Sequence, residues 1–150
     1  MEKERTLVLI KPDAMVKGLA GEIIGELSKL NLKMIGLKLV NVKRELAEQH
    51  YEEHKSKPFF EELIQHITGA LHNQENVIAI AYEGIDAIKK VRELAGATNP
   101  DDALPQTLRG KYGKINTKNK CHETVIHGSD SPSAGKREVA LWFDEKELII

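Results

Sequence analysis

The sequence predicts an α/β (α+β) fold in a single domain that spans residues 1–150. The length of 150 residues suits one hydrophobic core, and the 41% apolar and 30% charged fractions are those of an ordinary globular chain. Segments with strand and helix patterns alternate in the order β-α-β-αα-β-α-loop-β-α. This order favours a ferredoxin-like architecture, in which helices pack on one face of a four-stranded antiparallel sheet.

The first part of the chain supplies two strands and a helix. Residues 7–10 form an unbroken apolar run, typical of a buried strand, and Pro12 predicts a turn directly after it. Between residues 23 and 31 apolar positions recur at helical spacing. Residues 33–42 return to a β pattern, so a second strand is expected there.

A helical hairpin, a third strand and a long helix are expected next. Residues 45–57 have the pattern of a polar helix, and Pro58 is well placed to end it before a second helix begins at Phe59. The apolar, β-branched run at residues 77–82 predicts a strand. Apolar positions at helical spacing then predict a helix from residue 85 to Gly96.

The last third of the chain opens with a long connection. Residues 97–120 hold several prolines, glycines and asparagines among few apolar residues, which predicts an extended loop. Loops of this length in compact domains are usually functional or disordered. Residues 124–126 resume as a short strand, and Pro132 begins a last helix that runs toward Phe143.

Charge and cysteine content narrow the classes of function. The 22 basic and 23 acidic residues leave a net charge of −1, which supplies no overall field for nucleic acid or an anionic membrane. Cys121 is the only cysteine, which excludes an intrachain disulfide and favours an intracellular setting. The charged N-terminus leads into only a short apolar run, so no signal peptide or membrane span is expected. The sequence therefore predicts a cytoplasmic protein in which any anion site is local.

His127 is the strongest candidate for chemistry. It stands where a strand gives way to Gly128 and then to a helix, a place where an imidazole can lie at the mouth of a pocket. A nucleophilic imidazole needs one bare ring nitrogen and an acceptor that orients the other. Glu138, about two turns into the following helix, could be that acceptor. Taken alone, the same histidine and glutamate also fit a capped histidine and a surface carboxylate.

Cations from three segments could neutralise phosphate beside His127. Lys11 follows the first strand, Arg92 lies late in a helix, and Arg109 lies in the long loop. Phosphoryl transfer depends mainly on positioning and on neutralising spread negative charge, which is the use we expect for them. Thr98 and Arg109 are treated as nucleotide ligands, whereas the loop lysines fit a solvated surface. Phe59 could stack on a base, although one of the two adjacent phenylalanines is expected to face the core.

Ordered blocks of sequence resemble nucleoside diphosphate kinases over nearly the whole chain. The active-site signature of that family is similar to the run from Val125 through His127 to Ser131, with the acidic residue of the next helix at Glu138. Six further stretches match in the same order: Glu4-Arg5-Thr6, Ile10-Lys11-Pro12-Asp13, Gly18-Leu19 with Gly21-Glu22-Ile23-Ile24, His50-Tyr51 with Lys57-Pro58-Phe59-Phe60, Gly96-Ala97-Thr98-Asn99-Pro100, and Thr107-Leu108-Arg109-Gly110.

The resemblance implies a ping-pong reaction of low base selectivity. A nucleoside triphosphate, mainly ATP, would phosphorylate His127, and a nucleoside diphosphate would then remove the phosphoryl group. Mg²⁺ is the implied cofactor, held by the nucleotide phosphates rather than by protein ligands. A homo-oligomer, either tetramer or hexamer, is the implied assembly, and neither a membrane nor a specific nucleic acid is an implied partner.

The resemblance also assigns roles by position. Lys11 and Tyr51 would lie beside the transferred phosphate, while Glu138 would orient the imidazole and Ser129 would hydrogen-bond near Glu138. The nucleotide would be bound at its phosphates, base and sugar by a larger set: Lys11, Arg92, Thr98 and Arg109 for the phosphates, Phe59 and Leu63 for the base, and Thr124 at the sugar.

Three features depart from the family pattern. Thr124 stands where the family has an asparagine, and a hydroxyl is shorter and cannot donate as an amide does. The connections 109–127 and 67–77 are longer than usual, which is expected to affect the surface only. The chain ends at Ile150, soon after residues 144–148, without the extension that helps to hold many hexamers together.

Two rival functions follow from the same sequence. Ferredoxin-like sheets often bind RNA, but the low aromatic content of 5% and Tyr82 as the only aromatic residue on a clear central strand make a nucleic-acid-binding module a poor fit. A family member that has lost activity through Thr124 and the longer loops is the second rival. What argues against it is the presence of Lys11, Arg92, Arg109, His127 and Glu138.

Overall fold

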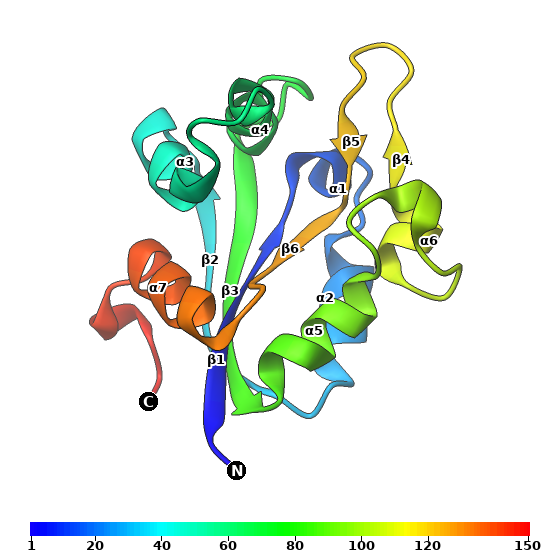
Figure 1. Ribbon diagram of the computed structural model, residues 1–150. Helices are drawn as coiled ribbons and strands as arrows, with labels where there is room; N and C mark the ends of the chain where they lie inside the picture. Colours follow the sequence, from blue (N-terminus) through cyan, green and yellow to red (C-terminus); the bar gives the residue numbers. More distant parts are fainter.

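A four-stranded antiparallel sheet forms the centre of the computed structural model, which describes residues 1–150 (Figure 1). Its strand order is β2-β3-β1-β6, and a separate two-stranded hairpin is made of β4 and β5. The strands are β1 (Lys3–Ile10), β2 (Lys33–Asn41), β3 (Asn76–Ile85), β4 (Lys114–Ile115), β5 (His122–Glu123) and β6 (Ile126–Gly128). The α-helices are α1 (Pro12–Val16), α2 (Ala20–Ser28), α3 (Arg44–His50), α4 (Phe60–Ile67), α5 (Ala87–Ala95), α6 (Leu108–Tyr112) and α7 (Pro132–Trp142).

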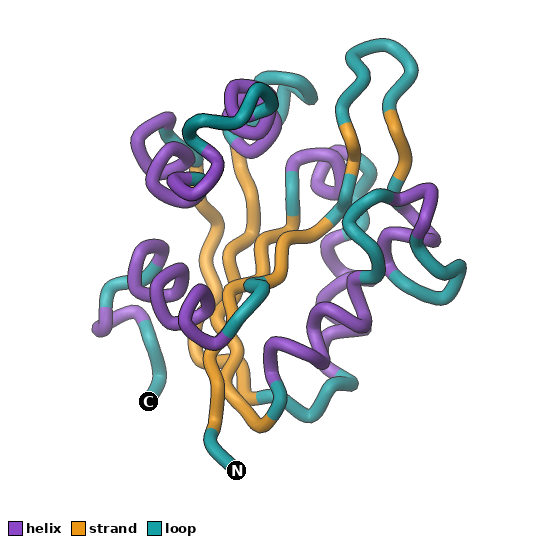
Figure 2. The backbone as a smooth tube through the Cα atoms, viewed as in Figure 1, coloured by secondary structure: helices purple, strands orange, loops and turns teal.

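Helices cover both faces of the sheet, so the expectation of helices on one face is wrong (Figures 1 and 2). Leu7 and Leu9 of β1 belong to a core shared with α3, α4 and α7, whereas Val8 and Ile10 belong to a second core shared with α1, α2, α5 and α6. Successive side chains of a strand point to opposite faces. The unbroken apolar run of β1 is therefore explained by burial on both sides.

The helical hairpin is shorter and more broken than expected. Residues 45–57 do not form one helix, because α3 ends at His50 and a single 3-10 turn, η1 (Glu52–His54), follows it. Helix α4 begins at Phe60, one residue later than expected, and Pro58 precedes it as predicted. A short helix, α1, also stands where only a proline turn is expected after β1.

The connection at residues 97–120 is folded rather than extended. It contains the 3-10 turn η2 (Pro100–Asp102), helix α6 and strand β4, and a last 3-10 turn, η3 (Glu145–Glu147), follows α7. Leu108 and Arg109 are buried, as is Cys121 just before β5. These anchors hold the connection against the body of the protein.

The last strand of the sheet begins two residues later than predicted. Thr124 and Val125 form a tight turn in which the amide of Ile126 donates to the carbonyl of Thr124 at 2.7 Å, and β6 then carries His127 beside Leu9. Val125 has a φ of 71°, a left-handed conformation that is rare for a β-branched residue. No helix of the structure is both long enough and apolar enough to cross a membrane.

Candidate active site

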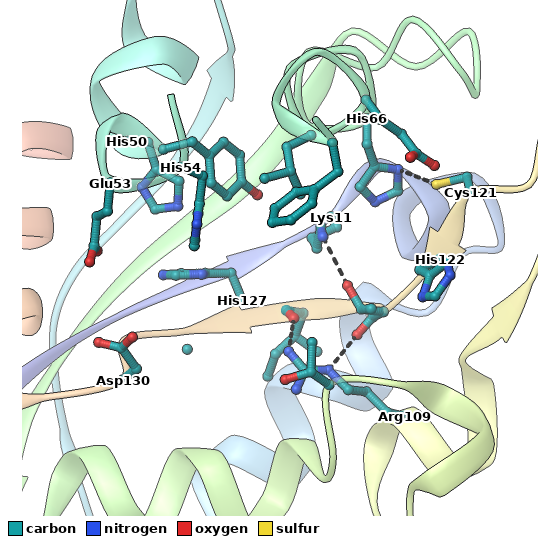
Figure 3. Close-up of a pocket in the computed structure, with 18 of the residues that line it drawn as sticks. Lys11, His50, Glu53, His54, His66, Arg109, Cys121, His122, His127 and Asp130 are labelled. Carbon is teal, nitrogen blue, oxygen red and sulfur yellow. Dashed lines mark hydrogen bonds between the residues drawn. The ribbon is translucent and has the colours of Figure 1, made fainter. Parts of the chain in front are cut away.

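A cavity of about 660 Å³ opens beside β6, between the α3–α4 hairpin and the connection that carries α6 (Figure 3). Ten of the eleven residues predicted for the site line it: Lys11, Tyr51, Phe59, Leu63, Arg92, Thr98, Arg109, Thr124, His127 and Glu138. The eleventh, Ser129, is buried behind Glu138. The fold thus gathers in one place the residues that the sequence distributes over the whole chain.

A chain of hydrogen bonds fixes the His127 imidazole. Its Nε2 lies 2.7 Å from Glu138 Oε1, and the Ser129 hydroxyl donates to the same oxygen at 2.7 Å. Ser129 Oγ in turn accepts the backbone amide of Leu7 at 3.0 Å. The orientation of the imidazole is therefore set by the backbone of β1, in which residues 6–10 are fully buried.

These contacts decide which ring nitrogen of His127 is bare. Burial opposes the charge on Glu138, but its bonds to His127 and Ser129 outweigh burial and hold the pKa of this carboxyl below its usual range. An ionised carboxylate only accepts hydrogen bonds, so the proton of the neutral imidazole lies on Nε2. Nδ1 is left with its lone pair free and with no partner in the protein.

Close packing of α7 on β1 brings Glu138 to this position. A Cβ on Gly135 would lie 2.0 Å from the backbone oxygen of Arg5, so only glycine allows the helix to approach this closely. Ser131 caps the start of α7 by accepting the amide of Ala134 at 3.1 Å. One turn after Gly135, the side chain of Glu138 is directed at His127.

His50 is a part of the site that sequence reasoning did not single out. Its ring packs edge-on against His127, with 4.6 Å between ring centroids, and its Nδ1 accepts the indole N–H of Trp142 at 3.1 Å. Burial and the neighbouring His127 hold the pKa of His50 well below its usual value, so it stays neutral. Its position beside Tyr51, in one of the matching sequence blocks, was the available signal.

Lys11 is a buried cation without a carboxylate partner. It is 6% exposed, and its Nζ donates to Thr124 Oγ1 at 2.8 Å, with no ion pair of its own. Burial is the main cause that lowers its pKa, to about 8, only partly offset by Asp13. Because burial disfavours the charged form of Lys11, an anion bound in the cavity would stabilise its ammonium group.

Arg109 is the second buried cation. Its guanidinium donates to the backbone oxygens of Thr124, Gly96 and Ile126 at 3.0, 2.9 and 2.8 Å, which fixes the turn before His127. Burial, followed by the nearby Arg92, lowers its pKa to about 10. Three of its five N–H donors are used in this way, and the other two remain for a ligand.

The tight turn at Val125 is held from three sides. Its amide donates to Asp13 Oδ2 at 3.0 Å and its carbonyl accepts the amide of Lys11 at 2.9 Å, while Arg109 binds the carbonyls on either side. Left-handed geometry of this kind costs about 1–3 kcal/mol and persists only where the surroundings enforce it. Here it aims the hydroxyl of Thr124 at Lys11.

Uncharged side chains, both aromatic and aliphatic, form another part of the cavity wall. Phe59 is 44% exposed beside the ring of His54, whereas Phe60 packs against the core, as the sequence argument expects of one of the pair. Thr98 is exposed and Leu63 half-buried on the same cavity. Tyr51 is buried, and burial raises the pKa of its phenol, so the hydroxyl keeps its proton.

Comparison with known proteins gives a consistent result. The family described as nucleoside diphosphate kinase matches residues 4–148. The nucleoside diphosphate kinase of Pyrococcus furiosus is 50% identical over 147 residues, which is 98% of this chain and 87% of that protein. The corresponding protein of Carboxydothermus hydrogenoformans is 49% identical over 97% of this chain and 91% of its own length.

Solved structures agree with the sequence relatives. A halophilic nucleoside diphosphate kinase from Halobacterium salinarum, in complex with CDP, is similar with a TM-score of 0.87 and 44% identity over 99% of this chain and 93% of that one. A transition state mimic of the enzyme from Borrelia burgdorferi, with bound vanadate and ADP, has a TM-score of 0.87 and 30% identity over 99% of this chain and 91% of that one. The ferredoxin-like fold and the matches along almost the entire chain lead to one conclusion: the protein belongs to the nucleoside diphosphate kinase family.

Proposed function

We propose that this protein is a nucleoside diphosphate kinase that carries the phosphoryl group on Nδ1 of His127. The observation that carries the proposal is the bare Nδ1, which faces a cavity lined by cations without carboxylate partners. In the first half-reaction Nδ1 attacks the γ-phosphorus of a nucleoside triphosphate, and the bond to the β–γ bridging oxygen breaks. A nucleoside diphosphate then attacks the same phosphorus, and the N–P bond breaks.

Each surrounding group has a task in this reaction. The imidazole becomes positively charged as the N–P bond forms, and Glu138 stabilises that charge through Nε2–H. Lys11, Arg92 and Arg109 neutralise the spread charge of the phosphates, and the Tyr51 hydroxyl is a donor beside them. No proton needs to leave His127, because Nδ1 is bare from the start.

Uncharged side chains are proposed to bind the base and the sugar of the nucleotide. The exposed ring of Phe59, with Leu63 close by, accepts any base by stacking, which supports low base selectivity. Thr98, which lines the same cavity, is proposed as a phosphate ligand. The Thr124 oxygen accepts from Lys11, which leaves its O–H free to donate to a sugar hydroxyl in place of the amide found in relatives.

The donors around the cavity fit a hard divalent cation bound mainly by phosphate oxygens. Asp130 and Glu53 are exposed carboxylates on the cavity wall, and no cluster of buried carboxylates competes for the ion. Mg²⁺, the proposed cofactor, would neutralise phosphate charge, and Asp130 and Glu53 would be the side chains available to hold it or its water. Nucleoside di- and triphosphates are the proposed substrates, and the cytoplasm is the proposed location.

The direct test is a brief exposure of the protein to γ-labelled ATP with Mg²⁺. The proposal expects a phosphoenzyme that is stable to alkali and labile to acid, and that loses its label when any nucleoside diphosphate is added. A protein that takes up no label contradicts it. Salt-dependent affinity for RNA without nucleotide transfer would instead support the nucleic-acid-binding module.

Glu138→Gln is expected to slow phosphorylation of His127 on the order of 10²-fold, because a neutral amide neither stabilises the developing imidazolium nor enforces the tautomer. Rapid-quench measurement of the labelled phosphoenzyme gives the rate. A fluorescence titration with nucleotide should show little change in nucleotide affinity. Glu62→Gln, which makes the same change at an exposed carboxylate on the same cavity wall, is the matched control. Equal rates in the two variants would mean that Glu138 does not orient the nucleophile.

A homo-oligomer is proposed from the free edge of the sheet. Strand β2 lies at the edge of the sheet, where its only outer backbone contact is a bond from the Ile149 amide to the Ile35 carbonyl, and it exposes Leu37 and Leu39 by 53% and 62%. An open strand edge with exposed leucines favours association with another copy. Leu39→Lys is therefore expected to reduce the molar mass in light scattering after gel filtration. Leu104→Lys, an equally exposed leucine away from this edge, should leave the mass unchanged.

A further inference from the structure

Three side chains outside the phosphoryl-transfer machinery converge beside the cavity. They are His66 near the end of α4, His72 in the following connection, and Cys121 just before β5. One ligating atom from each lies within 4.8 Å of the other two. Figure 3 shows the contact of His66 with Cys121 on the far side of Lys11 from His127. Two imidazoles and a thiol at this spacing are a ligand set for a divalent transition metal ion.

The first imidazole is held with one nitrogen toward the thiol. His66 Nδ1 lies 3.0 Å from Cys121 Sγ, and His66 Nε2 lies 3.1 Å from Asp13 Oδ1. His66 and Cys121 are 3% and 2% exposed. The Asp13 carboxylate faces Nε2 at ion-pair distance without hydrogen-bond geometry, and its negative charge favours the proton on Nε2 and a bare Nδ1 facing the sulfur.

The second imidazole is held by a hydrogen bond to a carboxylate and has a ring nitrogen without a partner. His72 Nε2 lies 2.7 Å from Glu123 Oε2, while its Nδ1 is buried and makes no hydrogen bond. The side chain of His72 is 9% exposed and its ring meets that of His66 edge-on, with 5.2 Å between centroids. A buried ring nitrogen without a partner is costly, and a bound ion would remove that cost.

Both histidines thus show the arrangement typical of metal ligands, in which the ring nitrogen away from the metal faces a carboxylate. From this geometry we propose that Nδ1 of His66, Nδ1 of His72 and Sγ of Cys121 bind a zinc ion. Asp13 and Glu123 lie behind the two imidazoles as orienting groups. The ion replaces the thiol proton, so binding releases one proton: Cys–SH and Zn²⁺ give Cys–S–Zn⁺ and H⁺.

The contact between Cys121 and His66 fits zinc with a small adjustment. Zn–S and Zn–N bonds of about 2.3 and 2.0–2.1 Å at a tetrahedral angle place sulfur and nitrogen about 3.6 Å apart. The sulfur and nitrogen of Cys121 and His66 therefore have to separate by roughly half an ångström. A water molecule can complete the tetrahedron, because three protein ligands leave one position open.

The ion would connect three segments at one wall of the nucleotide cavity. His66 and Cys121 both line that cavity, and Asp13 also accepts the amide of Val125 in the turn before His127. Hydrolytic chemistry by the thiol itself is a poor alternative, because Cys121 is almost completely buried. The proposed ion therefore joins these segments, and the proposal does not depend on the phosphoryl-transfer proposal.

Cobalt(II) is the probe for the test, because its absorption reports both tetrahedral geometry and thiolate ligation. The full chain carrying His127→Ala is titrated, since His50, His127 and Glu138 form a second group of possible ligands. The proposal expects one equivalent of Co²⁺ bound with tetrahedral bands and a thiolate charge-transfer band, and displacement of the cobalt by Zn²⁺. Zinc should also raise the thermal midpoint of the wild-type chain, and a chelator should reverse that rise.

Two variants and one control decide the outcome. Cys121→Ser should lose the charge-transfer band, and His72→Gln should weaken Co²⁺ binding by at least about tenfold. His122→Gln, which changes the exposed histidine next to Cys121, should bind as well as the parent. Circular dichroism shows that each variant is folded. Absence of a tetrahedral spectrum, or a charge-transfer band that survives Cys121→Ser, overturns the proposal, as does an equal loss of binding in His122→Gln.

Discussion

Replacing His127 with alanine is expected to abolish phosphoenzyme formation and to lower turnover on the order of 10⁶-fold, the scale seen when a catalytic nucleophile is removed. Nδ1 is the bare nucleophilic nitrogen that the Glu138 contact leaves facing the cavity. Alanine offers no substitute, and water cannot be expected to take the same position. Steady-state transfer from ATP to a nucleoside diphosphate and labelling with γ-labelled ATP both measure the loss.

The control for this prediction is His54→Ala, which removes another imidazole from the wall of the same cavity. This variant should still be labelled. Nucleotide affinity of His127→Ala, measured by calorimetry, should persist, because Lys11, Arg92 and Arg109 are untouched. Labelling of His127→Ala at the wild-type level would show that another residue carries the phosphoryl group.

Lys11→Met is expected to stabilise the free protein and to inactivate it. The pKa of Lys11 falls from 10.5 to about 8 mainly through burial, which corresponds to a cost of roughly 3 kcal/mol for holding the ammonium in place. Removing the buried charge stabilises the folded protein, but losing the hydrogen bond to Thr124 offsets part of that gain. A net increase of about 1–3 kcal/mol in the free energy of unfolding is therefore expected. Turnover should fall on the order of 10³-fold, because one phosphate-neutralising charge is gone. Urea denaturation and initial rates measure the two effects.

The pH dependence of the stability difference distinguishes the removal of a buried charge from a simple change in packing at residue 11. Below pH 8 the lysine is charged in both folded and unfolded chains, so the advantage of Lys11→Met is full there, and it fades as pH rises toward 10.5. Above pH 8 the wild-type lysine loses its proton in the free protein, and affinity for nucleotide should fall. The affinity of Lys11→Met should lack that fall, and a parallel decline in both proteins would assign it to another group.

The continuous apolar runs of β1 and β3 already indicated that both faces of the sheet are covered, which the predicted one-sided packing of helices did not take into account. The two apolar cores on opposite faces of β1 and β3 are implied by continuous apolar runs, because a strand with one wet face would alternate. Element order alone leads to the ferredoxin-like sheet, but it does not say how many helices each face receives. The run at residues 7–10 was therefore the better guide to the layers.

The long connection shows where local pattern fails. Residues 97–120 lack the periodicity of a helix or strand, and their order comes from distant anchors. Arg109 binds three backbone oxygens, and Cys121 meets His66, which lies 55 residues earlier in the chain. Contacts between residues so far apart produce no periodic pattern within a short stretch of sequence. A segment that such contacts fold is therefore predicted as a loop.

The sequence by itself determined the family, the nucleophile candidate and the residues around it, because ordered blocks such as the run from Val125 to Ser131 are specific even without coordinates. Tertiary structure decided what those blocks cannot express: that Nδ1 of His127 is the bare nitrogen, that Lys11 has no carboxylate partner, and that His66, His72 and Cys121 meet. Protonation and pairing depend on distances and burial, and these arise only when segments far apart in the chain are packed together.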